Sequence, residues 1–328
     1  MSPDLPLPNL VAQNRAAKSR RAIFFCLDDR YAPYALFLIQ QIRRAFPVAD
    51  FDICLVSDRP LAPHPVMDAM DLRLVQIDVG DMARFALIDD RLGLAAYLRA
   101  FMPRLWAGEY DRLLYLDADI YYQRGDIPAL FDLNLGGAAL AGVLDTKQWH
   151  KPNRAAEDLK PFNLPFCPYF NTGVLLIDVA AYNAQNVGED VLRLIAARGK
   201  DLEWHDQTAM NAVLQGKWAE LPVQWNYQFN HKTMIWASQF NVCFFHFIGA
   251  RKPFYGRYGA FSRRFTQPYQ RFLAQHFPQL AGQVLDGLGG VARLKALFFV
   301  AFSGAIRLQS ALRMEQRADG DFDLRLPK

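Results

Sequence analysis

Hydrophobic positions along this chain fall into two patterns: short apolar runs of strand length, and longer stretches in which apolar residues recur with helical spacing. The apolar runs lie at residues 22–27, 51–57, 72–78, 113–116, 138–145 and 169–179. The stretches with helical spacing lie at residues 34–46, 91–110, 190–198 and from about 207 onward. Strands that alternate with helices predict an α/β fold with a mostly parallel sheet and right-handed connections.

Acidic residues follow two of the predicted strands. The run at 113–116 ends in Asp117 and Asp119, and the strand at 22–27 is followed by an acid pair that begins with Asp28. Ligands of such sheets bind beyond the carboxyl ends of the strands. Residues i and i+2 of an extended chain point to the same side, so Asp117 and Asp119 can share one divalent cation. An isolated Asp-x-Asp is also common in ordinary polar turns, and that alternative stays open here.

A second run rich in candidate chemistry is VCFFHFIGARKPF, at residues 242–254. His246 interrupts an apolar strand, and a lone histidine in that setting is more often a hydrogen-bonded core residue than a ligand. Here it is followed by a basic turn that contains Gly249 and Lys252. An imidazole followed by such a turn suits a metal bound to a diphosphate, with His246 on the ion and with backbone amides and Lys252 on the oxygens.

Three further positions have both an ordinary and a functional interpretation. Arg99, in the helix before the central strand, is either a solvated charge or reaches a phosphate or an acid at the strand end. Residues 171–173 read Asn-Thr-Gly and either start a strand or let the backbone approach a ligand closely. His205 or Asp206 can cap a helix, or the first turn of that helix points His205, Asp206 and Gln207 into a cleft.

Composition narrows the class of protein. Of the 328 residues, 52% are apolar and 21% are charged, which is typical of a folded soluble protein. The net charge of +4 and the lack of a recognisable nucleic-acid-binding motif argue against a nucleic acid partner. The four cysteines are widely separated, which favours reduced thiols over bridges or a zinc site. The N-terminus lacks an apolar signal-peptide core, so we expect a cytoplasmic protein.

The C-terminal part of the chain is basic and then apolar. Residues 251–276 contain six Lys or Arg and no acid, which is consistent with a solvated face, an anionic lipid surface or an anionic acceptor. Residues 291–314 are apolar with interspersed basic residues, and their uncharged core at 296–306 is too short to span a bilayer. This segment is predicted to be an amphipathic helix in the membrane interface or a helix packed on the domain.

Together these motifs resemble those of family-8 glycosyltransferases, retaining enzymes of the GT-A fold that include bacterial lipooligosaccharide galactosyl- and glucosyltransferases and glycogenin. The resemblance runs from about residue 22 to 254. In the order of the family, the motifs are FFCLDDRYAPYALFLIQQI, LYLDADI (the DXD motif), YFNTGVLLID, HDQTAMN and HFIGARKPF. The resemblance implies a GT-A-type, Rossmann-like sheet flanked by helices, with a C-terminal helical extension. It also implies a hexosyltransferase that moves galactose or glucose from a UDP-sugar to an acceptor hydroxyl.

The resemblance further implies roles for individual residues. Asp28 and Tyr31 would contact the nucleotide, with Arg99 near the nucleotide or sugar, and Gly249 and Lys252 would bind the diphosphate. Mn²⁺, or Mg²⁺, would be held by Asp117, Asp119 and His246. The donor sugar and its chemistry would involve Asp145, Asn171, Asp206 and Gln207. Two positions depart from the family pattern. Arg30 stands where the family often has Asn, and Phe254 stands where it usually has Trp.

Retention with Gln207 near the face opposite the leaving group favours front-face attack, because an amide is a poor nucleophile. A metal-dependent nucleotidyltransferase would usually have a Gly-rich phosphate loop after the first strand, and LDDRYAP has none. A nicotinamide dehydrogenase is disfavoured as well, because no G-x-G-x-x-G motif follows a predicted strand in this chain. A non-catalytic sugar- or nucleotide-binding protein on the same fold is the alternative from another class.

We divide the chain into an N-terminal lead-in at residues 1–20, a GT-A catalytic domain at 21–260 and a helical, basic and apolar extension at 261–328. The expected acceptor is a glycan or glycolipid, with lipopolysaccharide or another envelope glycan implied by the family. Peripheral contact with the inner face of the membrane through residues 251–314 is part of the same expectation.

Overall fold

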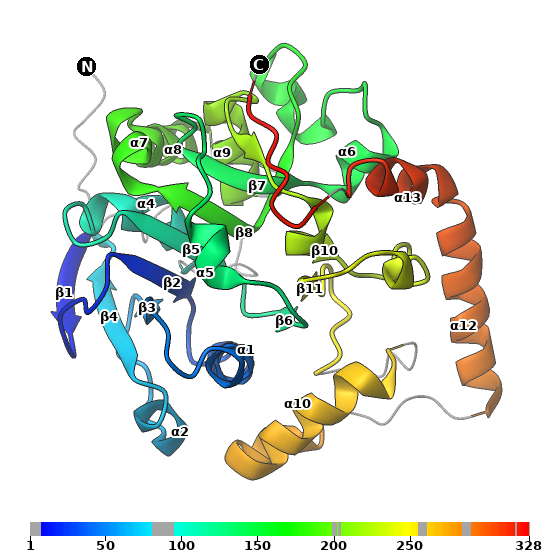
Figure 1. The fold of residues 1–328 in the computed structure, drawn as a ribbon, viewed down its shortest axis with the longest axis horizontal. Helices are drawn as coiled ribbons and strands as arrows, with labels where there is room; N and C mark the ends of the chain where they lie inside the picture. Colours follow the sequence, from blue (N-terminus) through cyan, green and yellow to red (C-terminus); the bar gives the residue numbers. More distant parts are fainter. Residues whose placement is uncertain are drawn as a thin grey trace.

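The structure is a computed structural model that describes residues 8–80, 95–198, 202, 205–254, 261–283, 290–318 and 320–327 (Figure 1). Its centre is an eight-stranded sheet with the strand order β1-β4-β3-β2-β5-β8-β7-β9. The strands are β1 (Asn9–Gln13), β2 (Arg21–Cys26), β3 (Asp52–Ser57), β4 (Leu72–Asp78), β5 (Arg112–Leu116), β7 (Leu140–Leu144), β8 (Phe170–Asp178) and β9 (Ala219–Glu220).

The sheet is parallel on one side and mixed on the other. Strands β4, β3, β2 and β5 run parallel to one another, whereas β8 is antiparallel to both of its neighbours, β5 and β7. Strand β1 adds an antiparallel edge to β4, inside the segment predicted to be a loose lead-in. The predicted α/β sheet flanked by helices is confirmed, and its parallel half ends where β8 reverses direction.

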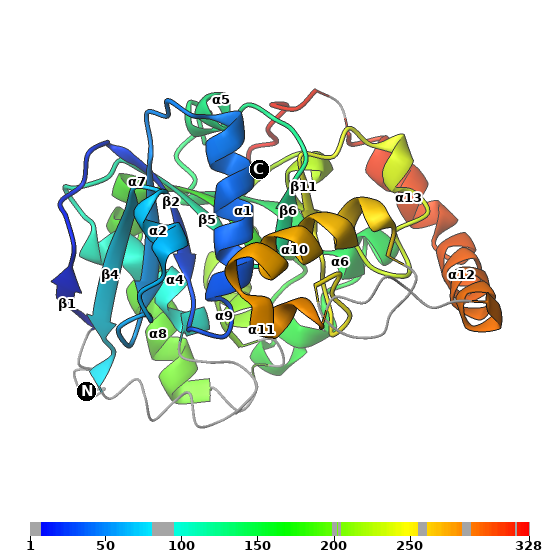
Figure 2. The same ribbon diagram turned by 90° about the horizontal axis from the view of Figure 1, so that it is seen from below.

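Helices cover both faces of the sheet. Helix α1 (Ala32–Ala45) lies on one face, while α4 (Ala95–Leu105), α7 (Val179–Ala184), α8 (Val187–Arg198) and α9 (His205–Leu214) pack together on the other (Figures 1 and 2). The core between sheet and helices is aromatic: the ring of Phe24 meets those of Trp106 and Tyr115 at 5.6 and 5.2 Å, and all three are buried. The cysteines are free thiols, as predicted.

A small second sheet contains His246, one of the predicted metal ligands. It has the order β10-β11-β6 and consists of β10 (Tyr227–Gln228), β11 (Phe244–His246) and β6 (Ile120–Tyr122). Strands β11 and β6 are antiparallel, with His246 opposite Ile120. This register brings the imidazole next to the acidic turn that precedes Ile120.

The connection between β7 and β8 contains two short helices. These are α6 (Thr146–His150) and the 3-10 helix η2 (Glu157–Phe162). The other short elements are α2 (Pro65–Asp68), α5 (Ile127–Phe131), η4 (Val223–Asn226) and η5 (Ala237–Gln239).

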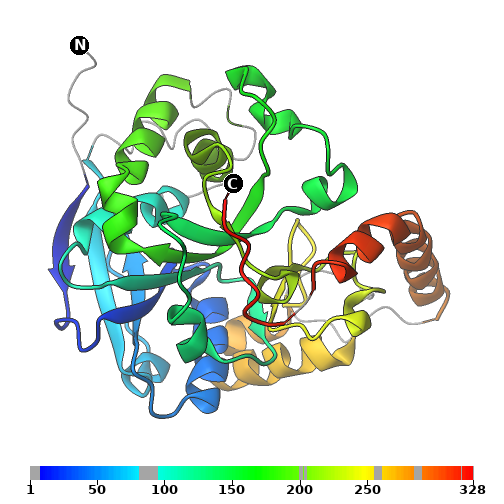
Figure 3. The ribbon, with the colours of Figure 1, turned by 45° about the horizontal axis from the view of Figure 1, so that its top comes forward.

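The predicted C-terminal helical extension is present. It consists of α10 (Arg263–His276), α11 (Pro278–Ala281), α12 (Gly290–Ala305) and α13 (Leu308–Glu315). Helix α10 contacts α1, and α13 contacts α6 (Figure 1). The chain then returns across the body (Figure 3), where Arg325 forms an isolated antiparallel bridge with Glu220, the last residue of β9. The boundaries at residues 20 and 260 stay predictions.

Candidate metal and donor site

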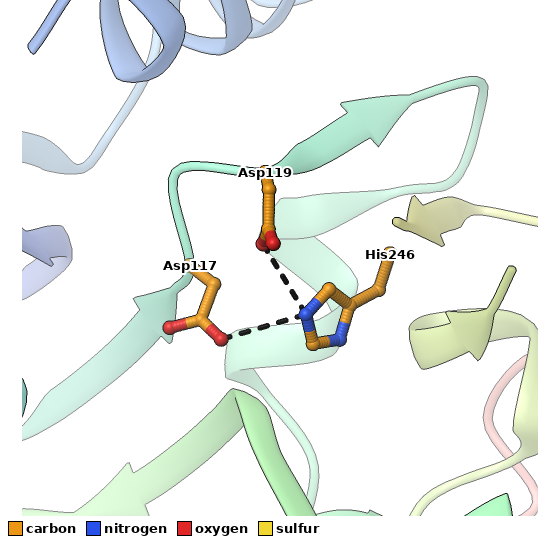
Figure 4. Close-up of side chains that lie close together, drawn as sticks. All are labelled: Asp117, Asp119 and His246. Carbon is orange, nitrogen blue, oxygen red and sulfur yellow. Dashed lines mark ion pairs between the residues drawn. The ribbon is translucent and has the colours of Figure 1, made fainter. Parts of the chain in front are cut away.

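Two carboxylates and one imidazole converge at the carboxyl end of β5. Asp117 and Asp119 follow that strand, and His246 is the last residue of β11. The imidazole Nε2 lies 3.2 Å from Asp119 Oδ1 and 3.5 Å from Asp117 Oδ2 (Figure 4). The potential ligand atoms of the three residues lie within 4.8 Å of one another. The structure therefore brings together the three side chains that the sequence analysis placed on one cation.

A chain of hydrogen bonds fixes which ring nitrogen of His246 faces the carboxylates. The backbone N–H of Gly173 donates to Asn171 Oδ1 at 3.0 Å, so that atom must be the amide oxygen. The same oxygen accepts from Asn226 Nδ2 at 2.9 Å, which turns Asn226 Oδ1 toward His246 Nδ1 at 3.0 Å. Nδ1 therefore carries a hydrogen, and Nε2 is the nitrogen presented to the acids.

This arrangement fits a divalent cation. Asp119 Oδ1 is fully buried and accepts no hydrogen bond from any residue that the structure describes. In the neutral imidazole the Nε2 lone pair points at this oxygen, and two facing acceptors are unfavourable unless a proton or a cation lies between them. Two carboxylates and an imidazole nitrogen are a ligand set that Mn²⁺ accepts.

Lys252 occupies the other oxygen of the same carboxylate. Its ammonium group donates to Asp119 Oδ2 and to the carbonyl oxygen of Phe247, and its side chain is almost fully buried. Burial alone would raise the pKa of Asp119, but the ammonium group of Lys252 and the neighbouring imidazole of His246 outweigh burial, so this pKa lies below its usual range. Gly249, in the turn before Lys252, is exposed and has a φ of +81°, a conformation that favours glycine.

Arg99 bridges two acids of the site from helix α4. Its Nη1 donates to Asp117 Oδ1 at 2.9 Å, and its Nε lies 3.0 Å from Asp206 Oδ2. The guanidinium stacks 4.4 Å above the ring of Tyr115, whose hydroxyl also donates to Asp117. Burial would lower the pKa of Arg99, but Asp206, Tyr115 and Asp117 outweigh it and raise this pKa. The interpretation of Arg99 as a solvated helix charge is therefore wrong, since it reaches the acid at the strand end.

We expect Arg99→Met to destabilise the fold strongly, because it leaves Asp117 and Asp206 without the cation between them. Removal of one partner of a buried ion pair typically costs about 3–5 kcal/mol of unfolding free energy. Arg193→Met on the neighbouring helix α8 is the control: Arg193 and its partner Asp190 are both exposed, and loss of a surface pair costs about 1 kcal/mol or less. Urea unfolding of both variants measures the difference, and equal losses would contradict the bridging role.

A polar cluster lies beside the acids, on β8 and the ends of β7 and α9. Asn171 Nδ2 donates to Gln207 Oε1 at 3.1 Å and to Asp145 Oδ2 at 3.4 Å. Gln207 Oε1 also accepts from the backbone N–H of Thr172 at 3.2 Å, which assigns this atom as the oxygen. Asp145 caps α6 by accepting from Lys147 N, and burial raises the pKa of its carboxyl despite that hydrogen bond.

The first turn of α9 supplies two of the predicted residues. Asp206 is almost fully buried and pairs with Arg99, whereas Gln207 is half-buried and hydrogen-bonds to Asn171. The turn therefore directs Asp206 and Gln207 toward the other site residues, and the cleft itself stays a prediction. The side chain of His205 lies outside the described residues.

The two residues assigned to the nucleotide lie at the start of α1. Asp28 is held by the guanidinium of Arg30 at 2.6 and 2.9 Å, so the departure at Arg30 acts directly on the carboxylate assigned to the nucleotide. Tyr31 is 39% exposed at the N-cap position of α1. Phe254 is buried and stacks on Tyr34 with 4.0 Å between ring centroids, so this departure affects packing.

Sequence reasoning missed Asn226, which orients His246, and Tyr115, which hydrogen-bonds to Asp117. A signal for Asn226 was available. Gln224, Asn226 and Gln228 alternate with apolar residues in one short run, and all three are buried. Buried amides at alternate positions require hydrogen-bond partners, which indicates a polar site next to the core. Tyr115 gave no such signal, because tyrosine is common in strands.

Comparison with known sequences identifies the family. The sequence model described as Glycosyl transferase family 8 matches residues 22–255, which is well over half of the chain. The chain belongs to glycosyl transferase family 8. The match extends over β2 to β11 and includes every predicted site residue. The protein is therefore a glycosyltransferase, and the resemblance found in its motifs is confirmed.

Relatives of this family 8 chain come from several bacteria. It is 28% identical to General stress protein A of Bacillus subtilis over 255 residues, covering 70% of this chain and 86% of the relative. It is 31% identical to the lipopolysaccharide 1,2-glucosyltransferase of Escherichia coli over 173 residues. It is 29% identical to the lipopolysaccharide 1,3-galactosyltransferase of Salmonella typhimurium over 178 residues. The match spans only about half the length of each lipopolysaccharide enzyme.

Solved structures share the fold of the family 8 chain. The galactosyltransferase LgtC, in complex with donor and acceptor sugar analogs, superposes with a TM-score of 0.61 at 19% identity, covering 84% of this chain and 99% of that one. The bifunctional glycosyltransferase WbbM superposes with a TM-score of 0.61 at 20% identity, covering 83% of this chain and 53% of that one. These similarities confirm the predicted GT-A fold.

Proposed function

We propose that the protein transfers a hexose, glucose or galactose, from a UDP-sugar to an acceptor hydroxyl with retention of anomeric configuration and with Mn²⁺ as cofactor. The observation that carries this proposal is the convergence of potential ligand atoms of Asp117, Asp119 and His246 to within 4.8 Å of one another. Lys252 pairs with the carboxylate of Asp119 in the same site. Residues from two distant parts of the chain thus form a site for a cation and for the anionic group that the cation neutralises.

The chemistry follows from charge. When the bond to the sugar breaks, negative charge develops on the departing diphosphate, and a bound divalent cation supplies electrostatic stabilisation of that charge. Lys252 adds a buried ammonium group at the same place, and the turn at Gly249 offers backbone N–H groups. Positive charge develops on the sugar ring as the bond breaks, and the buried carboxylates of Asp145 and Asp206 stabilise this charge electrostatically.

Front-face attack is the route that the side-chain contacts favour. Gln207 Oε1 already accepts hydrogen bonds from Asn171 and from the Thr172 backbone, which lowers its ability to act as a nucleophile. Asp206 is held by Arg99 in a buried ion pair, so its carboxylate is not free to form a bond to the sugar. With both side chains engaged, the acceptor hydroxyl attacks on the face that the diphosphate leaves, and the departing phosphate oxygen takes its proton.

Incubation of the purified chain with a panel of UDP-sugars and Mn²⁺ tests the proposal. Release of UDP from UDP-glucose or UDP-galactose, with the product anomer of the donor configuration by NMR, is the expected result. Release of pyrophosphate from a nucleoside triphosphate would instead identify a nucleotidyltransferase. Binding of UDP-sugar with no turnover on any acceptor would identify a non-catalytic binding protein. A stable sugar adduct on Asp206 or Gln207 would overturn the front-face route.

The proposed acceptor is a glycan or glycolipid of the bacterial envelope, in lipopolysaccharide or a related polymer. Support comes from the relatives described as lipopolysaccharide glucosyl- and galactosyltransferases. We place the protein in the cytoplasm at the inner face of the membrane, with the catalytic domain at residues 21–260. Mass spectrometry of products formed on candidate acceptors identifies the acceptor.

Helix α12 supports membrane contact. Val300 and Gly304 face the body, whereas Leu294, Phe298 and Phe302 form an exposed apolar stripe with helical spacing, each more than half exposed. Basic residues of the same helix suit an anionic surface. Within the described ranges no single helix is long and apolar enough to cross a bilayer, whereas the pair 293–305 and 308–315, bent by 62°, meets the length and composition criteria together.

We expect the double variant Phe298→Ser/Phe302→Ser to lose binding to phosphatidylglycerol vesicles by at least about tenfold, because two apolar side chains no longer enter the interface. Vesicle sedimentation measures the change. Val48→Ser is the control, since Val48 is 96% exposed in the turn after α1, away from α12. UDP release by the double variant on a water-soluble acceptor should stay normal. Unchanged vesicle binding would show that α12 does not contact the membrane.

A further inference from the structure

A cavity of about 210 Å³ lies between helix α6 and helix α13. Its wall begins at Thr146, the residue directly after Asp145, and continues along the loop that follows α6. The opposite wall is formed by α13 and by residues 227–236. Figure 1 shows α6 and α13 side by side at the edge of the domain. The polar cluster at Asp145 and the cavity therefore meet at the N-terminus of α6.

Basic residues outnumber acidic ones around this cavity, because Glu157, paired with Arg154 at 3.2 Å, is the only acid among the residues that line it. Lys151, Lys232 and Arg307 line it, and none of the three has an ion-pair partner in the part of the chain that the structure describes. Lys147, by contrast, is neutralised by Asp158 at 2.7 Å. The pKa of His150, another lining residue, is lowered by its burial and by the positive charges around it, including Arg307 and Lys151. A cavity with this potential attracts anions.

Two residues that line the cavity, Arg307 and Ser310, carry buried hydrogen-bond donors without a partner among the described residues. The donor atoms are Arg307 Nη1 and Ser310 Oγ. Ser310 is 8% exposed, and the two residues lie one turn apart at the start of α13. Buried donors without an acceptor are rare and costly in folded proteins, and a guanidinium beside a hydroxyl matches the oxygens of a phosphate.

The position of these donors is fixed by contacts behind them. Arg313 Nη1 donates to the carbonyl oxygens of Trp149 and His150 at 3.2 and 3.3 Å, which ties α13 to the end of α6. Trp149 and Trp236 both line the cavity, and their indole N–H groups donate to backbone carbonyls. Aromatic rings on this wall suit the carbon skeleton of a sugar.

We propose that this cavity binds an anionic group, of the phosphate monoester type, on the acceptor glycan. The proposal rests on the proposed function, because it takes the donor sugar to lie at Asp145 and the acceptor beyond it. Exposed lysines such as Lys151 and Lys232 are ordinary on any surface. The buried, partnerless donors of Arg307 and Ser310 distinguish the cavity from a solvated basic face.

Calorimetric titration of the full chain with glucose 6-phosphate and with glucose tests the proposal. UDP and Mn²⁺ are kept saturating, so that the donor site does not bind the phosphate. We expect glucose 6-phosphate to bind more tightly than glucose, and R307Q to weaken glucose 6-phosphate at least about tenfold. S310A should weaken it by a smaller factor, and R307K should retain part of the affinity. R44Q, on α1, removes an exposed charge elsewhere and should change nothing.

Each outcome is decisive. Equal binding of glucose and glucose 6-phosphate, or unchanged binding in both R307Q and S310A, would overturn the proposal. Phosphatidylglycerol vesicles separate the two sources of a phosphate: if R307Q weakens vesicle binding and leaves glucose 6-phosphate binding intact, the charge serves a lipid surface and the acceptor assignment falls. UDP binding with Mn²⁺ is measured first in the same samples. Its absence would refute the proposed function, whereas the hexose titration still decides the cavity.

Discussion

Asp119→Asn should abolish the effect of Mn²⁺ on this protein, with affinity for the ion reduced at least about 100-fold. Asparagine keeps the size of the side chain and an oxygen acceptor for Lys252, so the buried ammonium keeps a partner. It removes the anionic oxygen that faces His246 at 3.2 Å, and a neutral amide is a poor ligand for a hard cation. Electron paramagnetic resonance titration of Mn²⁺ measures the loss directly, and UDP release should fall by a similar factor.

A second readout makes this prediction independent of turnover. A cation that binds only the folded state raises the melting temperature, so Mn²⁺ should stabilise the wild type and leave Asp119→Asn unaffected. Asp111→Asn is the matched control, because Asp111 is exposed just before β5, at the other end from the acid pair, and pairs with Arg20. If Asp119→Asn binds Mn²⁺ like the wild type, the assignment of the cation to this acid pair is wrong.

The fold was predictable where the pattern is local. Buried strands such as β2 and β3 are continuous apolar runs, and α1 shows helical spacing, so their types follow from sequence alone. Strand β8 was found as an apolar run, but a strand buried on both faces has no periodicity that reports its direction. Strand β1 was missed because all five of its residues are exposed, which leaves no alternation of apolar and polar positions.

The candidate metal ligands were predictable from the sequence, whereas the residues that orient them were not. Asp117 and Asp119 are neighbours in sequence, so their convergence follows from strand geometry. The approach of His246 depends on the register between β6 and β11, two strands far apart in the chain that no local pattern aligns. The role of Asn226 depends on the pairing of β10 with β11 and on the position of Asn171 in β8. Family resemblance supplied the ligand set, whereas the hydrogen bonds that orient it required the structure.

Gly173 shows both how far the sequence was informative and what the structure adds. The sequence analysis allowed a close approach to the backbone there, and the structure identifies the approaching side chains as those of His246 and Asp117. A Cβ atom at this position would lie 2.3 Å from His246 Cε1, 2.5 Å from His246 Nδ1 and 3.0 Å from Asp117 Oδ2. The backbone of Gly173 cannot retreat easily, because its carbonyl accepts from Asp117 N and its N–H donates to Asn171. We therefore expect Gly173→Ala to displace the imidazole and to weaken Mn²⁺ binding at least about 100-fold.

A pair of comparisons tests whether this loss comes from the clash itself. Gly142→Ala, on the adjacent strand, would meet only the side chains of Phe170 and Leu175 at 3.3 and 3.4 Å, so Mn²⁺ binding should stay within a few-fold of the wild type. Overpacking at Gly173 should also cost about 1–3 kcal/mol of unfolding free energy. That cost should shrink when His246→Ala removes the ring, because the two positions are coupled through contact. If the cost is the same in both backgrounds, the imidazole does not lie against Gly173, and the arrangement that presents its Nε2 to the acids is incorrect.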